Sequence, residues 1–278
     1  MSEHPIGEGI SDVIRTYELL DRVRLGRDIV IRDDQFEAEA LRDAAGLARA
    51  KGIGVSLLDT GRFDAAQLDW LIREGVRFYT SDDVPRQAQE LALILRSAVK
   101  AGSFAAYFLN GRMPGESAQT GLSRDELLTL VSDGLDLHLS NQAQARDIAA
   151  LGELTAAGRA AGSSPVYYHH GPLGDGLAGL AASGAWVHFS DRSLPDELSA
   201  TTAIAVAGAA RRAGVRVAVY VETGLPLDIL TRMFAAGAAI LFLTPPSDYK
   251  SLQRPLEQKA LRRKLPLRAY WLSTTFLP

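Results

Sequence analysis

Hydrophobic and polar residues alternate along this chain in a repeated order. In residues 164–193 an apolar run ends at a glycine turn, and a short amphipathic stretch, another glycine and a second alternating run follow. The same order occurs in 55–83, 105–142 and 217–248. Each copy contains Leu-x-x-Leu/Met-x-x-x-Gly: Leu68/Leu71/Gly75, Leu127/Leu130/Gly134, Leu177/Leu180/Gly184 and Leu230/Met233/Gly237. We interpret this as an internal repeat of four strand–helix–strand–helix units.

Further elements flank the four copies. Apolar residues at helical spacing predict a helix over 10–23, followed by a strand at 28–34 and a helix at about 35–51. The pattern near the end predicts a last strand at 267–273. Gly, Pro and Ser in 112–122 indicate a long loop, which is either a lid or a surface for a partner.

Alternating strands and helices predict a parallel sheet with right-handed crossovers. Four copies supply eight strands, the number that closes a (βα)8 barrel, so we expect a TIM-barrel-like α/β fold. An open parallel α/β sheet and an α/β solenoid are the alternatives, since the flanking strands raise the count to ten. No Pro/Gly/Ser-rich linker divides the chain, so we expect one domain over 1–278, with 1–26 as an N-terminal helical extension.

Composition narrows the classes of partner. The 278 residues are 47% hydrophobic and 23% charged, with a net charge of −3, which gives no basic footprint for nucleic acid or an anionic membrane. Without Cys the chain has no disulfide, thiolate nucleophile or cysteine metal site. We find no secretory signal and no apolar run of about 18 residues. We expect a cytoplasmic protein with a small-molecule ligand, and its oligomeric state stays open.

Alternation along the strands predicts which side chains point into the barrel. For the second strand of copies one to three this inward set is Tyr79/Ser81, His138/Ser140 and His188/Ser190. Aligning the first strands on their turn glycines predicts four more inward residues: Leu57, Tyr107, Tyr167 and Tyr220. We interpret the three tyrosines as packing residues rather than as the wall of a ligand site.

Asp59, His169 and Glu222 occupy one repeat position at the ends of the first strands. Barrel active sites lie at the C-terminal ends of the strands, so we expect the three side chains to converge there. With His138 and His188 they could run acid–base chemistry or hold a divalent metal. No compact metal motif such as HExxH is present, so the metal stays unknown. The alternative is that they are loop-edge residues that satisfy backbone groups.

Other polar residues at strand ends are candidates for ligand binding: Arg32, Asp33, Asn110, Ser140, His170 and Ser190. The Ser-Asp and Ser-Asn pairs at 81–82, 140–141 and 190–191 are more simply interpreted as helix N-caps. The glycine-rich segment 169–176 is interpreted as a turn rather than as an anion site.

We therefore expect an isomerase, lyase or hydrolase of a sugar or a hydroxy- or oxo-acid. Glu222 or Asp59 would be the base, His169 the acid or a metal ligand, and His138 and His188 would orient the substrate. The alternative is a non-catalytic barrel that acts as a scaffold or a regulatory, ligand-binding protein, since one fold serves many functions.

Overall fold

The computed structural model describes residues 16–26, 29–109, 122–222 and 224–242. The chain divides into two compact units, residues 1–137 and residues 138–278, which we call the first and the second unit. None of the helices in the described part of the chain is both long and apolar enough to cross a membrane.

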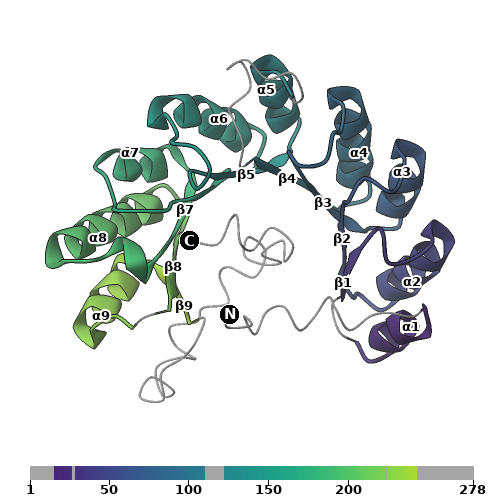
Figure 1. Ribbon diagram of the computed structural model, residues 1–278, viewed down its shortest axis with the longest axis horizontal. Helices are drawn as coiled ribbons and strands as arrows, with labels where there is room; N and C mark the ends of the chain where they lie inside the picture. Colours follow the sequence, from purple (N-terminus) through teal and green to yellow (C-terminus); the bar gives the residue numbers. More distant parts are fainter. Residues whose placement is uncertain (1–15, 27–28, 110–121, 223, 243–278) are drawn as a thin grey trace. The chain divides into compact units, whose positions relative to one another are not determined.

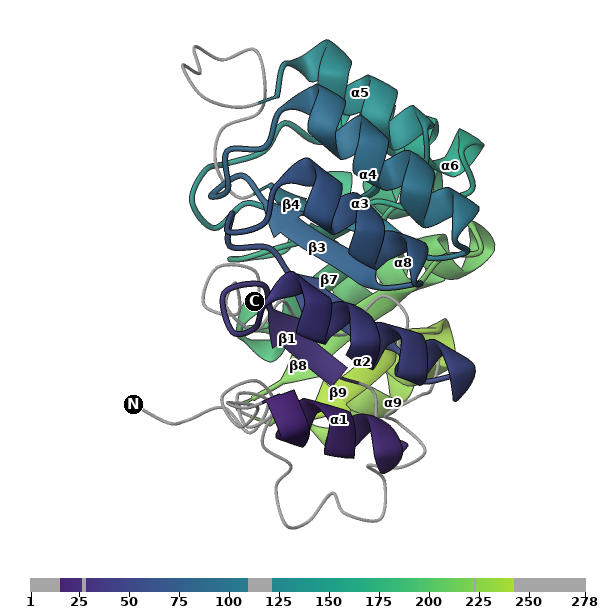
Figure 2. The same ribbon diagram turned by 90° about the vertical axis from the view of Figure 1, so that its right-hand side faces the viewer.

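The first unit alternates strands with helices. Its elements are α1 (Thr16–Arg24), β1 (Ile29–Arg32), α2 (Ala38–Ala50), β2 (Val55–Leu58), α3 (Ala65–Arg73), β3 (Arg77–Ser81), α4 (Ala88–Lys100), β4 (Ala105–Leu109) and α5 (Arg124–Ser132). Strands β1 to β4 pair in parallel in the order of the chain. Helices α2, α3 and α4 lie side by side over one face of these strands (Figures 1 and 2).

The second unit continues the alternation from β5 (Asp136–Ser140), whose residues from His138 belong to it. Its other elements are α6 (Ile148–Ala160), β6 (Val166–Tyr168), α7 (Gly176–Ser183), β7 (Trp186–Ser190), the 3₁₀ turn η2 (Asp191–Ser193), α8 (Glu197–Arg212), β8 (Val217–Val221), α9 (Leu227–Ala236) and β9 (Ala239–Phe242). Strands β5 to β9 also pair in parallel in chain order. Helices α6 to α9 lie along one face of them (Figure 1).

The strand order and the placement of the helices confirm the predicted (βα)8-barrel-like α/β fold. A doubly wound open sheet reverses its strand order and carries helices on both faces. Within each unit the strand order follows the chain without a reversal, and the helices keep to one face (Figure 1). Nine strands lie in the described residues, and the tenth candidate, 267–273, lies outside them.

Local sequence signals explain where the helices begin and end. Asp64 accepts a hydrogen bond from the backbone N–H of Gln67, whose side chain accepts one from the N–H of Asp64, so the pair forms a capping box for α3. Gly184 and Gly237 end α7 and α9 in the left-handed region, with φ of 108° and 109°, where a Cβ would be strained. The repeat-motif leucines and Met233 are buried at 0–2% exposure, which anchors each helix on its sheet.

The flanking elements agree in part with their predicted ranges. The helix predicted at 10–23 is α1, described from Thr16 onward, and the strand predicted at 28–34 is β1. The loop 112–122 lies outside the described residues except for Leu122. The prediction of one domain over 1–278 stays a prediction.

The parallel register corrects part of the inward set. Paired residues on neighbouring parallel strands share a face, and Leu57 pairs with Phe78 while Thr80 pairs with Tyr107. Leu57 and Tyr107 therefore lie on the face predicted for Phe78 and Thr80, opposite to Tyr79. The prediction that they share a face with Tyr79 is wrong.

The second unit divides the tyrosines in the same way. Tyr167 pairs with Leu139 and Val187, whereas Tyr168 pairs with His188 and Ser140. Tyr220 pairs with Ser190, so it lies on the face of His188 as predicted. The alignment on turn glycines failed because β8 reaches its glycine with one residue more than β6 does, and one residue reverses the face of a strand side chain.

Candidate functional site

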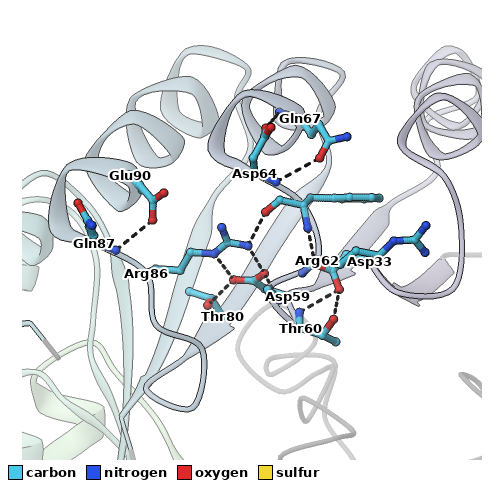
Figure 3. Close-up of polar contacts among 12 residues, drawn as sticks. Asp33, Asp59, Thr60, Arg62, Asp64, Gln67, Thr80, Arg86, Gln87 and Glu90 are labelled. Atoms are coloured by element: carbon cyan, nitrogen blue, oxygen red, sulfur yellow. Dashed lines mark hydrogen bonds and ion pairs between the residues drawn. The ribbon is translucent and has the colours of Figure 1, made fainter. Parts of the chain in front are cut away.

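Asp59, at the end of β2, is held by four hydrogen bonds (Figure 3). Arg86 donates from Nε to Oδ2 at 2.9 Å and from Nη2 to Oδ1 at 2.6 Å. Thr80 Oγ1 donates at 2.7 Å, and the backbone N–H of Gly61 at 3.0 Å. The Asp59 side chain is 0% exposed. The hydrogen bonds that Arg86 donates to the Asp59 carboxylate raise the pKa of Arg86. This geometry makes Asp59 an anchor of the loops rather than an available base.

Asp33, which follows β1, organises the turn after β2 (Figure 3). Its Oδ1 accepts hydrogen bonds from the backbone N–H and the hydroxyl of Thr60, and its Oδ2 accepts one from the N–H of Arg62 at 3.2 Å. Asp33 is fully buried, and burial raises its pKa. One carboxylate thus fixes the loop that carries Asp59.

The second unit repeats this arrangement, which we call the loop clamp: a side chain just after one strand holds the backbone beyond the next strand. Asn141, after β5, donates from Nδ2 to the carbonyl of His170 at 2.9 Å and accepts from its N–H at 2.7 Å. Asp191, after β7, accepts from the N–H groups of Glu222 and Gly224 at 3.1 and 3.0 Å.

The clamps correct the prediction that the Ser-Asp and Ser-Asn pairs cap helices. Asn141 and Asp191 hold neighbouring loops instead. Ser81 and Ser140 accept hydrogen bonds from the N–H two residues ahead, at 3.2 and 3.0 Å, and so close local turns. The α-helices that follow these strands begin at other residues, Gln87, Asp147 and Asp196.

His169 lies half-buried at the end of β6, where the sequence predicts a catalytic group. Its Nε2 is 2.9 Å from the carbonyl oxygen of Pro172, and its Nδ1 is 3.4 Å from the hydroxyl of Tyr167. A carbonyl oxygen only accepts, so Nε2 carries the proton and Nδ1 keeps the lone pair. Burial lowers the pKa of His169 below its usual 6.5 and raises that of Tyr167 to about 12.

His170 shares this environment. Burial and the neighbouring His169 lower its pKa, so both imidazoles are mainly neutral at pH 7. The Asn141 side chain is hydrogen-bonded to both the backbone N–H and the backbone C=O of His170. Two adjacent neutral imidazoles therefore lie at one strand end, and Asn141 holds the backbone that carries the second.

Glu222, at the end of β8, forms an ion pair with Arg192, which follows β7, at 2.7 Å. Its side chain is 16% exposed and that of Arg192 is 71% exposed. The pair lies at the same edge of the sheet as His169, since parallel strands end together. Asp59 belongs to the first unit, so its convergence with His169 and Glu222 stays a prediction.

His138 and His188 alternate with two tyrosines on the strand face opposite to Tyr167. His138 Nδ1 is 3.1 Å from the Tyr168 hydroxyl, and His188 Nδ1 is 3.1 Å from the Tyr220 hydroxyl. The rings of Tyr168 and His188 meet edge to face with centroids 4.8 Å apart. All four side chains, which we call the His–Tyr row, are at most 5% exposed.

The remaining binding candidates have separate surroundings. Arg32 forms an ion pair with Asp34 at 2.5 Å on the surface. Ser140 and Ser190 are buried at 0% and 2% exposure on the face of the His–Tyr row. Asn110 lies outside the described residues. In the part of the chain that the structure describes, no three His, Asp or Glu side chains are grouped to hold a metal ion.

Sequence reasoning missed Arg86, Tyr168 and the clamp role of Asn141. A signal for Arg86 was present: an arginine stands directly before the N-cap residue of α4, and Arg146 stands in the same place before α6. Arg146 donates from Nε to the carbonyl of Ser140 at 2.6 Å, so both arginines tie a loop to a strand end.

Comparison with known proteins assigns no family. No family model matches the chain, and no curated protein matches it. Among solved structures it is similar to a deoxyribose phosphate aldolase from Aeropyrum pernix, with 16% identity, a TM-score of 0.32, and 87% of this chain and 94% of that chain covered. It is also similar to an HpcH/HpaI aldolase from Desulfitobacterium hafniense, with 13% identity, a TM-score of 0.33 and coverage of 96% and 92%.

A third similar structure is the catalytic domain of a β-amylase from Paenibacillus polymyxa, with 10% identity, a TM-score of 0.28 and coverage of 88% and 94%. At these scores the similarities assign no activity to this chain.

Proposed function

We propose that this chain is an enzyme that transfers protons to and from a small polar molecule at the strand ends of the second unit. The observation that carries the proposal is His169, an imidazole held neutral by burial, with Nε2–H fixed on the Pro172 carbonyl and a lone pair on Nδ1. A general base works best when its pKa lies near the working pH and its orientation is set in advance.

The other groups at this edge suit such chemistry. Glu222 is the second titratable side chain at this edge, and its partner Arg192, which is 71% exposed, presents a guanidinium that matches a carboxylate or phosphate. The clamps from Asn141 and Asp191 hold both loops, which keeps the reacting groups from moving apart. Isomerase or lyase chemistry, in which a proton next to a carbonyl is removed, fits these groups, with a sugar or a hydroxy- or oxo-acid as substrate.

Solvent isotope exchange tests this proposal. The full chain is incubated in D₂O with a panel of hydroxy acids, oxo acids, sugars and sugar phosphates, and proton NMR follows the C–H signals next to the carbonyl. We expect exchange in at least one panel member. His169→Gln keeps a side-chain N–H for Pro172 but has no basic nitrogen, so exchange should slow about 100-fold or more. Asp228→Asn, at an exposed position of α9, is the control that should leave the rate unchanged.

A specific observation favours a second candidate, the non-catalytic ligand-binding barrel. Asp59 and Asp33, both site candidates, are buried and engaged by neighbouring groups. This candidate predicts that a panel member raises the melting temperature while no panel member exchanges protons. That result would contradict the enzyme proposal.

A further inference from the structure

His170, directly after His169 at the end of β6, carries a buried ring nitrogen that the protein leaves unpaired. Among the described residues, no group forms a hydrogen bond with His170 Nε2. Folded proteins generally pair such atoms, because a buried nitrogen that has lost water and gained no partner costs free energy. The residue as a whole is half-buried, so it stands at the border between the protein and solvent.

Two polar residues near His170 already bond elsewhere. Asn141 uses both its amide oxygen and its amide nitrogen on the backbone of His170. Tyr168, two residues before His170, places its hydroxyl 3.1 Å from His138 Nδ1. The fold therefore fixes the backbone of His170, while Nε2 of its ring has no partner in the part of the second unit that the structure describes.

The charge state of His170 selects the kind of group that suits this nitrogen. Burial and the neighbouring His169 lower the pKa of His170, so its ring is neutral at pH 7. A neutral imidazole nitrogen donates or accepts one hydrogen bond, according to its tautomer. A hydroxyl group does both and fits either tautomer, whereas a charged group would lose hydration without meeting an opposite charge on the ring.

We propose that His170 Nε2 binds a hydroxyl group of the substrate. The substrate is then a sugar or a hydroxylated acid rather than an oxo acid without a hydroxyl. This inference rests on the proposed function, in which His169 accepts the proton next to the carbonyl. His170 is then a specificity-determining residue, because an analogue without the hydroxyl gives its buried nitrogen no partner.

Ligand-observed NMR titrations of the full chain test this inference with two matched pairs of probes. Hydroxypyruvate is compared with pyruvate, and dihydroxyacetone with acetone, since the members of each pair differ only in hydroxyl groups. We expect the hydroxylated member of at least one pair to bind about three- to tenfold more tightly than its analogue. His170→Phe keeps an aromatic ring without nitrogen and should abolish this preference. His170→Gln keeps a polar amide and should retain part of it.

Thermal unfolding separates a ligand site from a structural role of the ring. His170→Phe removes a buried unpaired nitrogen, so the melting temperature should stay the same or rise. Tyr220→Phe is the comparison, since it removes a hydroxyl that lies 3.1 Å from His188 Nδ1. An equal drop in both variants would mean that a structural water alone pairs His170 Nε2 in solution, which would overturn the inference.

The binding data give three further results that would overturn it: neither hydroxylated probe binds, both pairs show no preference, or the preference survives in His170→Phe. Proton exchange in D₂O is measured separately. A preference for the hydroxyl without exchange would remove the enzyme proposal and leave hydroxyl binding at His170. Exchange without such a preference would remove this inference alone.

Discussion

Arg86 meets Asp59 with two of its guanidinium nitrogens, at 2.9 and 2.6 Å, in a pair whose side chains are 7% and 0% exposed. The same arginine donates to the carbonyl of Phe63 at 2.8 Å. It therefore ties the start of α4 to the loop between β2 and α3. Asp59, one of the two bases predicted from the sequence, thus helps to link two connections of the first unit.

Removing one partner of this pair should destabilise the protein strongly. Asp59→Asn leaves the buried Arg86 charge uncompensated, which typically costs about 3–5 kcal/mol in the free energy of unfolding. Urea denaturation measures this loss. The exposed pair Arg24–Asp21 is the control, and Asp21→Asn should cost less than about 1 kcal/mol. The double variant Asp59→Leu/Arg86→Met should cost less than the sum of its single changes, and simple additivity would contradict the account of the pair.

The loop clamp at Asn141 should control the order of the His169–His170 segment. Asn141→Ala removes two hydrogen bonds to the His170 backbone, which should cost about 1–3 kcal/mol. Amide hydrogen exchange at His170 should become faster than the loss of global stability explains. The amides of helix α8 should change only by as much as that global loss predicts. Unchanged protection at His170 would show that the clamp does not hold the loop.

Stability should rise with pH across the range in which free histidine titrates. The pKa values of His169 and His170 are lower in the folded protein than the unfolded value of about 6.5. Below pH 6.5 the unfolded chain binds protons that the folded chain refuses, so stability is fully present above pH 6.5 and falls as the pH drops toward the folded pKa values.

The urea midpoint measured from pH 5 to 8 tests this sign. The wild-type protein should lose more stability between pH 7 and 5 than His169→Gln/His170→Gln does. Identical pH profiles would mean that neither imidazole has a lowered pKa.

The His–Tyr row should depend on its hydroxyl groups. Tyr220→Phe removes the hydroxyl that lies 3.1 Å from His188 Nδ1. The Nδ1 atom of the fully buried His188 ring then loses that partner. We expect a loss of about 1–3 kcal/mol in the free energy of unfolding. Tyr17→Phe, at a residue that is 56% exposed, should change it by less than about 0.5 kcal/mol. Equal effects of the two substitutions would argue against a bond between Tyr220 and His188.

The spacing of apolar residues was sufficient to predict the architecture. Each strand and helix buries its apolar face whichever residues of neighbouring strands are paired. Leu68, Leu127 and Leu230 are all fully buried in their helices, as the shared motif predicts. It was harder to predict which side chains of the first strand in each repeat point inward. One extra residue before the turn reverses the two faces, as Tyr167 and Tyr220 show.

The partners of the candidate residues could not be predicted from the pattern. Asp59 and Arg86 are separated by a helix and a strand, and only folding brings them together. Similarly, Asn141 reads as a helix cap in sequence because its local context suits one, but its side chain meets His170 on the next connection. Side chains that act across loops are outside the reach of local rules.

The proposed chemistry depends most on the state of His169. Nitrogen-15 NMR of histidine-labelled full-length protein, titrated with pH, reports the protonated ring nitrogen and the pKa, and His169→Gln assigns the signal. We expect a proton on Nε2, none on Nδ1 at pH 7, and a pKa below 6.5. A proton on Nδ1, or a pKa at or above 6.5, would contradict the assignment of His169 as the proton-accepting group.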